Sequence, residues 1–269
     1  MQTYQLIIPV SIILLCGCQQ AREQVIDNPV DLEKDSIYYE IKAFNREYGD
    51  CQIDTSAYCT RVSFTYPVFG SEKYAGQASA INNTIQRSLL KEFYPDTIEN
   101  KSIEAFADQF IDDYKEIKAS FGEAFGWYAN MNGTVLRNDS STITVELKSD
   151  LYTGGAHGNI TVKYLNFNPA TGNIITLDSL FKRGYKEELN KIVEDRFRKT
   201  HGISPNADLS DEGFQFENEL YYNAENFAFL ADGIKFYYNN YEIAPYSSGP
   251  FEVMVPYNEI KDLIRKDQE

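Results

Sequence analysis

Alternating apolar and polar residues predict β-strands along most of the chain, and three stretches with helical spacing interrupt them. The clearest strand has Val62, Phe64 and Tyr66 alternating with polar residues, and we expect Pro67 to end its pairing. The other predicted strands lie within 36–50, 125–135, 143–147, 160–167, 174–177, 227–230, 234–241 and 251–255.

Two local signals predict irregularities in these strands. Asn132-Gly133 is typical of a hairpin turn. At Leu165 and Phe167 the apolar residues change to the other parity, which predicts a β-bulge. The polar and acidic stretch 203–223 is predicted to be a loop with a short helix at most.

Apolar stripes at helical spacing predict three main helices. They cover residues 74–93, a segment from about Ser102 to Ile117, and 185–201, where Gly202 ends the helix. A short helix is predicted at 260–264. Connections between most strands are too short for parallel crossovers. We therefore expect an α+β fold with mainly antiparallel sheets, two helices in the N-terminal lobe and one main helix in the C-terminal lobe.

The N-terminus reads as a targeting segment. The apolar run 6–15 is too short to span a bilayer, and it has the length of the apolar region of a signal peptide. The string Leu15–Cys18 resembles a bacterial lipobox, although residues 1–5 contain no Lys or Arg. The resemblance implies a signal peptide over 1–17 and a lipid on Cys18; the alternative is an ordinary secretory signal cut a few residues later. Residues 18–35 are polar and acidic and are predicted to be a tether.

The two cysteines that follow agree with export. Cys51 and Cys59 are separated by seven residues, and an even pair in an oxidising compartment predicts a disulfide. A metal-binding pair is the alternative, but two cysteines without a nearby histidine make a poor zinc site.

Charge and aromatic content narrow the classes of partner. Forty acidic against 25 basic residues give a net charge of −15, so nucleic acid is a poor partner and a basic protein a better one. Twenty Tyr and 17 Phe favour β-structure and an aromatic binding face.

Enzyme motifs are sparse. The only histidines are His157 and His201, and the sequence has no Gly-x-Ser-x-Gly elbow and no Asp-x-Asp-x-Asp-Gly calcium loop. We therefore expect no catalytic residues, no cofactor and no metal. A glycoside hydrolase with a carboxylate pair stays open, because sequence does not show distances between acidic residues.

The most distinctive string is the glycine-rich segment 152–159. Its glycines permit positive φ and close approach by a ligand, which makes Tyr152, Gly154, Gly155 and His157 candidate ligand-binding residues. The structural alternative, which is the more common one, is a tight turn whose histidine caps a backbone carbonyl.

The second candidate segment is 241–251, an aromatic loop around a Ser-Ser-Gly turn. Tyr241, Pro245 and Tyr246 are its candidate ligand-binding residues, for a sugar or a peptide. Here too the more common alternative is a structural connection between two strands.

These strings carry two family resemblances, which together cover about residues 36–265. The Gly-Gly-Ala-His string, residues 165–181 and residues 241–257 resemble the extracellular domain of RsiV-type anti-sigma factors. Cys51 and Cys59, the strand after them and the two helices are similar to the accessory domain of PdaC-type peptidoglycan deacetylases. The resemblance implies a PdaC-accessory-like domain over 36–150 and an RsiV-extracellular-like domain over 151–269.

The resemblance also implies a function, in part. The RsiV-type domain binds lysozyme and thereby releases a sigma factor; since nothing precedes the apolar run that could lie in the cytoplasm, we expect no sigma factor partner here. The deacetylase centre needs an Asp and two His four residues apart, whereas His157 and His201 are 44 residues apart.

We therefore expect a non-catalytic lipoprotein of the cell envelope, anchored by its lipid to the inner or outer membrane and facing the periplasm or the exterior. Its expected ligand is a cell-wall-associated molecule, in the most specific version a lysozyme-like protein. The alternatives are a module that binds peptidoglycan or other glycan fragments and, in a different class, the hydrolase with an acidic pair.

Overall fold

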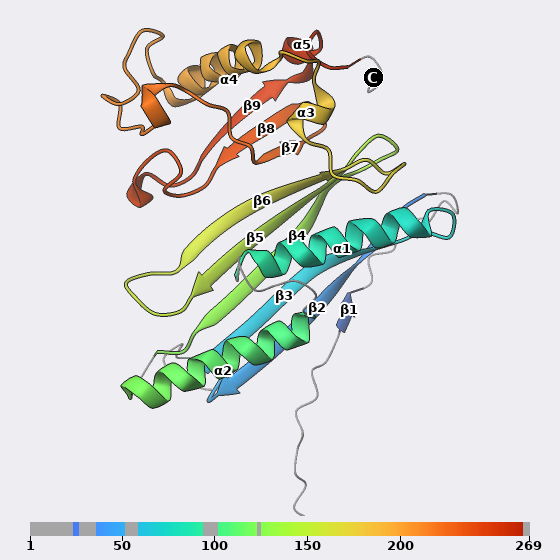
Figure 1. Cartoon of the computed structure of the whole chain (residues 1–269), viewed down its shortest axis with the longest axis vertical. Helices are drawn as coiled ribbons and strands as arrows, with labels where there is room; N and C mark the ends of the chain where they lie inside the picture. Colours follow the sequence, from blue (N-terminus) through green and yellow to red (C-terminus); the bar gives the residue numbers. More distant parts are fainter. Residues whose placement is uncertain (1–23, 27–35, 52–58, 94–101, 123–124, 266–269) are drawn as a thin grey trace, which may run out of the picture.

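A computed structural model describes residues 24–26, 36–51, 59–93, 102–122 and 125–265. Two β-sheets follow one another along the chain, each with helices packed against it (Figure 1). The predicted α+β class with mainly antiparallel sheets is confirmed. The predicted signal peptide and Cys18 lie outside the described residues.

The first sheet has six strands in chain order, β1-β2-β3-β4-β5-β6. Neighbouring strands are antiparallel except β3 and β4, which are parallel because both helices of this lobe lie between them in the sequence. The elements are β1 (Gln24–Ile26), β2 (Tyr38–Gly49), β3 (Cys59–Gly70), α1 (Ala75–Lys91), α2 (Ile103–Phe121), β4 (Tyr128–Asn138), β5 (Ile143–Tyr152) and β6 (Asn159–Phe167).

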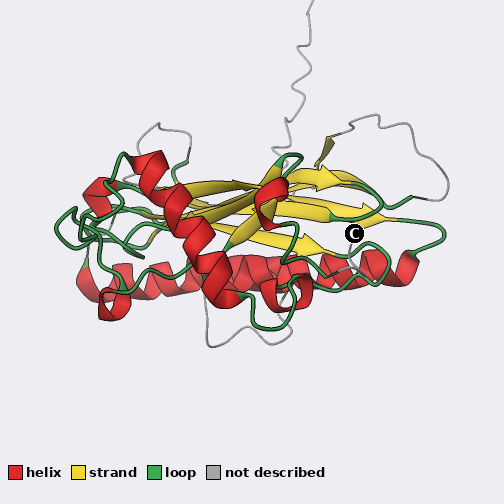
Figure 2. Ribbon diagram, turned by 90° about the horizontal axis from the view of Figure 1, so that it is seen from above, coloured by secondary structure: helices red, strands yellow, loops and turns green. Residues whose placement is uncertain are grey.

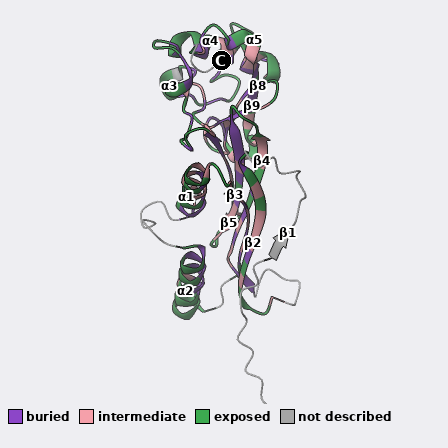
Figure 3. Cartoon of the chain, turned by 90° about the vertical axis from the view of Figure 1, so that its right-hand side faces the viewer, coloured by how far each residue is buried: buried purple, intermediate pink, exposed green. Residues whose placement is uncertain are grey.

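Helices α1 and α2 cover one face of this sheet, with their buried sides toward the strands and their exposed sides toward solvent (Figure 3). The alternation in β3 explains this arrangement: Val62 and Phe64 are fully buried under the helices. Phe64 packs against Phe93 and Phe106, with ring centroids 5.4 and 5.5 Å away. Seen from above, the long helices lie along one side of the strands (Figure 2).

The second sheet has three antiparallel strands, β7-β8-β9. Phe197 of α4 is the centre of its core and contacts Phe214, Tyr221 and Tyr238. Gly202, in a left-handed conformation, ends α4 as predicted. The elements are α3 (Leu177–Leu180), α4 (Lys186–His201), η1 (Glu217–Glu219), β7 (Phe227–Phe229), β8 (Gly233–Tyr238), η2 (Tyr246–Ser248), β9 (Phe251–Pro256) and α5 (Tyr257–Ile260).

Asparagine side chains join the two sheets where β6 meets β7. Asn166 is buried in β6, donates to the carbonyl of Phe227 (2.7 Å) and accepts from the N–H of Phe229 (3.1 Å). From the other side, Asn226 and Asn239 bond to the backbone of β6. The open edge of the first sheet is therefore closed by side chains of the second lobe.

Three local predictions are wrong. Asn132 and Gly133 lie inside β4 and form no hairpin. The register between β5 and β6 is continuous, so there is no bulge at Leu165. In 174–177 the chain forms an isolated bridge at Ile174 and then begins α3, which Thr176 caps.

Other boundaries differ in detail. Pro67 ends pairing on one side only: β3 stays paired with β2 to Gly70, while its pairing with β4 ends at Thr65. Part of the predicted tether, Gln24–Ile26, pairs with β2. The first sheet continues to Phe167, so the expected division at residue 150 falls inside β5. No helix within the described residues is long and apolar enough to cross a membrane.

Candidate functional site

The two segments singled out from the sequence meet at one edge of the molecule. The rings of His157 and Tyr246 are stacked, with centroids 4.4 Å apart and planes 20° apart. Tyr241 lies against Tyr246 (5.2 Å), and Tyr152 stacks on Tyr128 (5.6 Å). We call these five residues the aromatic rim. It joins the β5–β6 loop of the first sheet to the β8–β9 loop of the second, both on the left side of Figure 1.

The glycine-rich loop places Nδ1 of His157 against a backbone carbonyl. Gly154 and Gly155 have φ of 107° and 99°, which a side chain would strain, and the Tyr152 hydroxyl donates to the carbonyl of Gly155 (3.1 Å). Nδ1 of His157 lies 2.8 Å from the carbonyl of Gly158. A carbonyl only accepts, so Nδ1 carries the proton, and in the neutral tautomer of the ring Nε2 is an acceptor. His157 is exposed, so this acceptor is open to a ligand.

Gly158 lets the backbone of the loop lie close to a tyrosine–aspartate pair. A Cβ at this position would lie 2.6 Å from the hydroxyl oxygen of Tyr128 and 3.2 Å from a carboxylate oxygen of Asp150. Burial and the hydrogen-bonded carboxylate of Asp150 raise the pKa of Tyr128. The phenol therefore stays protonated and donates to Asp150, which places one negative charge beside the rim.

The second loop is shaped by its backbone. Tyr241 has φ of 67°, a left-handed conformation that is rare for a residue with a side chain, and its ring is 61% exposed. The N–H of Asn239 donates to Glu242 (2.8 Å), which fixes the start of the turn. Burial raises the pKa of Glu242. Pro245 and Tyr246 follow, with Tyr246 at the start of η2.

Sequence reasoning found most of this site and missed part of it. His157, Tyr241 and Tyr246 are in contact, Tyr152 stacks on Tyr128, and Gly154, Gly155 and Pro245 shape the loops. The missed residues are Tyr128 and Asp150. Tyr128 pairs with Tyr152 across β4 and β5, a neighbour relation that only the register reveals.

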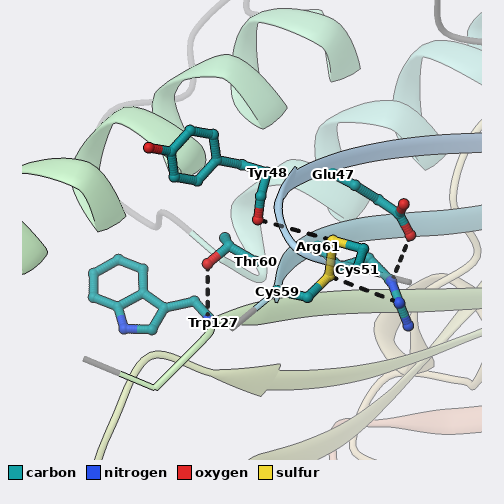
Figure 4. Close-up of a disulfide and its surroundings, with 7 residues drawn as sticks. All are labelled: Glu47, Tyr48, Cys51, Cys59, Thr60, Arg61 and Trp127. Carbon is teal, nitrogen blue, oxygen red and sulfur yellow. Dashed lines mark hydrogen bonds and ion pairs between the residues drawn. A yellow bond between two sulfur atoms is a disulfide. The ribbon is translucent and has the colours of Figure 1, made fainter. Parts of the chain in front are cut away.

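The disulfide joins the end of β2 to the start of β3, close to Trp127, the residue before Tyr128 (Figure 4). Cys51 and Cys59 are bonded, as predicted. Glu47 lies within reach of both sulfurs, and together these three are the one metal-ligand cluster among the described residues. Both sulfurs are used in the disulfide and Glu47 pairs with Arg61 (2.9 Å), so the oxidised cluster does not fit a metal ion.

Among the residues that the structure describes, no two acidic side chains form a buried pair of the kind expected for the glycosidase alternative. None of the Asp or Glu side chains that the structure describes is buried. Glu146, the acceptor of the Tyr164 hydroxyl (3.0 Å), and the half-buried Glu242 are bound to neighbouring groups of the protein. Within the described residues we therefore identify no catalytic constellation.

Two family models match separate parts of the chain. Residues 53–160 match the model of the deacetylase PdaC, and residues 178–258 match a model described as a protein of unknown function, DUF3298. The first match confirms the PdaC resemblance; the RsiV-type resemblance of the C-terminal part stays a prediction.

Among curated proteins, the chain is 22% identical over 240 residues to the peptidoglycan-N-acetylmuramic acid deacetylase PdaC of Bacillus subtilis. The alignment covers 87% of this chain but 46% of that enzyme, so the chain spans about half the length of this relative. It is also 28% identical over 186 residues to the immunogenic protein MPT64 of Mycobacterium tuberculosis, covering 65% of this chain and 75% of that protein.

Crystal structures show the same fold. A DUF3298 family member from Bacteroides fragilis superposes with a TM-score of 0.72 at 19% identity, over 87% of this chain and 95% of that one. One from Pseudomonas aeruginosa PAO1 gives 0.67 at 20% identity, over 87% and 97%. In sequence and fold, the chain thus joins a segment similar to the PdaC model to one similar to DUF3298.

Proposed function

We propose that the chain is a non-catalytic binding module of the cell envelope, and that the aromatic rim binds glycan strands of the cell wall. The observation that carries this proposal is the contact between two loops from different sheets, in which the exposed ring of His157 stacks on the partly exposed ring of Tyr246 and the exposed ring of Tyr241 lies beside it. Aromatic faces pack against the C–H face of a sugar ring, and tyrosine adds a polar edge for sugar hydroxyls.

Similarity to a peptidoglycan deacetylase supports a cell-wall ligand. It also supports a place outside the cytoplasm, which agrees with the predicted signal peptide over 1–17, the lipid on Cys18 and the disulfide. In this proposal the lipid holds the module on the inner or outer membrane, and the rim faces the periplasm or the exterior.

A second candidate ligand is a basic protein of the lysozyme type. The net charge of −15 and the carboxylate of Asp150 beside the rim favour this partner, because opposite charge raises the association rate. Tyrosine is also enriched among residues that dominate protein–protein binding energy.

Binding to peptidoglycan fragments and to a c-type lysozyme, measured by interferometry at low and at physiological salt, tests both candidates. We expect Tyr246→Ala and His157→Ala to weaken binding at least tenfold. Phe121→Ala is the matched control, because Phe121 is 78% exposed on α2 and lies outside the rim.

The salt series separates the outcomes. Rim-dependent binding of wall fragments at physiological salt supports the proposal, and rim-dependent binding of lysozyme alone supports the second candidate. Binding of either ligand that disappears with salt and ignores the two rim variants is general charge attraction and contradicts a role for the rim.

A further inference from the structure

The charge beside the aromatic rim is negative and unpaired. Among the described residues, no Lys or Arg forms an ion pair with Asp150, and no cation lies over a ring of the rim. The charged and ionisable groups that act on Tyr128 are Asp150, Tyr152 and Tyr246. Arg61, which lies opposite Tyr128 in the register of β3 and β4, is paired with Glu47 (2.9 Å). The rim therefore offers ring faces and one carboxylate, and none of its five residues is a Lys or Arg.

Two features of the rim favour the binding of a cation. The face of a tyrosine ring attracts a positive charge, and a carboxylate forms its strongest hydrogen bonds with a charged N–H donor. In its neutral tautomer, His157 adds a third acceptor through Nε2. A ligand with a carboxylate of its own would instead meet like charge at Asp150.

The number of rings in the rim favours a ligand that also has an apolar ring face. Two ring pairs lie here, Tyr128 with Tyr152 and His157 with Tyr246, and the exposed ring of Tyr241 lies against Tyr246. Five rings offer more apolar face than the head group of one lysine or arginine side chain covers, and this suits a chain of sugar rings. A neutral N-acetylated sugar would fill the ring faces and leave the carboxylate of Asp150 without a cationic partner.

We propose that the aromatic rim selects sugars that carry a free, protonated amine over their N-acetylated forms, with the amine bound by Asp150 and the sugar face by the tyrosines. The proposal rests on the proposed function and names the class of sugar that the rim takes.

Two hexasaccharides that differ only in acetylation test this selectivity. We expect the glucosamine hexamer to bind the full chain, purified in detergent, about tenfold more tightly than the N-acetylglucosamine hexamer at physiological salt. Asp150→Asn keeps an acceptor for Tyr128 but removes the charge, so it should abolish this preference. The matched control is Asp232→Asn, because Asp232 is exposed in the loop between β7 and β8, outside the rim.

Three outcomes overturn the proposal. Equal affinity for the two hexamers removes the selectivity. If the preference for the glucosamine hexamer persists in Asp150→Asn, its cause is the net charge of the whole chain and not Asp150. A hexalysine peptide serves as a third ligand. If it binds as tightly as the glucosamine hexamer and with the same dependence on Asp150, the rim binds basic protein side chains and not amino sugars.

Tyr246→Ala separates this result from the proposed function. If Tyr246→Ala weakens both hexamers equally while the wild type binds them equally, the rim is a glycan site without amine selectivity. If neither hexamer nor any wall fragment binds the wild type, the glycan proposal itself fails.

Discussion

The side-chain amide of Asn226 bonds to two backbone groups of β6: its Oδ1 accepts from the N–H of Tyr164 (2.8 Å) and its Nδ2 donates to the carbonyl of Val162 (2.7 Å). The amide thus takes the place of the next β-strand. An open strand edge would leave these backbone groups without partners at the contact between the two sheets, where burial makes unpaired groups costly. This bond pair explains why the two lobes meet at β6.

Replacing Asn226 with Ala should destabilise the protein by about 1–3 kcal/mol, because the partly buried N–H of Tyr164 loses its partner and the carbonyl of Val162 keeps only the bond from Asn239. Asn226→Asp should be at least as harmful, since a carboxylate oxygen would face the carbonyl of Val162. Urea unfolding measures both. Asn206→Ala, at an exposed position of the same lobe, is the control and should change stability by less than about 0.5 kcal/mol. Equal stability of Asn226→Ala and the control would show that the amide does not hold the lobes together.

Gly133 explains why a turn signal appears inside a strand. A Cβ on this residue would lie 2.8 Å from the ring of Pro67 and 3.1 Å from the Cα of Tyr66, so β4 approaches β3 more closely than a side chain allows. We expect Gly133→Ala to cost about 1–3 kcal/mol through overpacking. The matched variant Gly76→Ala, in α1 with no atom near the added methyl, should stabilise by about 0.5–1 kcal/mol. Thermal unfolding of both variants checks these opposite signs.

The fold could be predicted wherever one face of a strand is buried and the other is open. Val62 and Phe64 alternate with residues that are not buried, and this periodicity predicts β3 correctly. The same rule fails at the end of β6. Tyr164 and Leu165 are both buried, Tyr164 toward the second lobe and Leu165 toward the helices, so apolar residues occur at both parities without a bulge.

The candidate site could be predicted only as far as it is local in sequence. Glycine and tyrosine content identified the loops that contain His157 and Tyr246, and the structure stacks these two rings. Nothing in the sequence near Tyr128 connects it with Tyr152; the register of β4 and β5 does so. Asp150 was missed for the same reason, because its effect depends on the distance to Tyr128.

The disulfide should contribute measurably to stability. Cys51 and Cys59 close a short loop and tie the end of β2 to the start of β3. Restricting the unfolded chain over a loop of this length corresponds to about 2–3 kcal/mol. We expect the double variant Cys51→Ser/Cys59→Ser to lose this amount in urea unfolding, and reduction of the wild type to give the same loss. If reduction changes the wild type and the double variant equally, the disulfide is not the cause.

His201 should make the C-terminal lobe sensitive to mild acid. Its ring lies between Phe197 (4.6 Å) and Phe251 (5.2 Å), and its Nε2 is buried without a partner. Burial lowers the pKa of His201 below the value of the unfolded chain, near 6.5. As pH falls below about 6.5, the unfolded state binds the proton first, so stability is lost until the folded pKa is passed.

Urea unfolding between pH 8 and pH 5 checks this sign. The burial-raised pKa of Glu242 acts in the opposite direction, so the informative quantity is the difference between the wild type and His201→Phe. We expect this difference to grow as pH falls. His157→Ala is the control, because that histidine is exposed. A difference that stays constant over the pH range would show that His201 is not the sensor.

Asn239 should control the rim without touching a ligand. The Asn239 side chain forms two hydrogen bonds with the backbone of Val162: it accepts from the N–H (2.7 Å) and donates to the carbonyl (3.1 Å). The backbone N–H of Asn239 donates to Glu242 at the start of the turn that contains Tyr241. It therefore sets where the second loop meets the first. We expect Asn239→Ala to weaken rim-dependent binding about fivefold to tenfold, which corresponds to about 1–1.4 kcal/mol. Asn226→Ala breaks a similar clamp outside the rim loops; it should lower stability and leave the affinity of the folded protein unchanged. If both variants weaken binding in proportion to their loss of stability, Asn239 acts only on folding, and the position of the loop does not determine affinity.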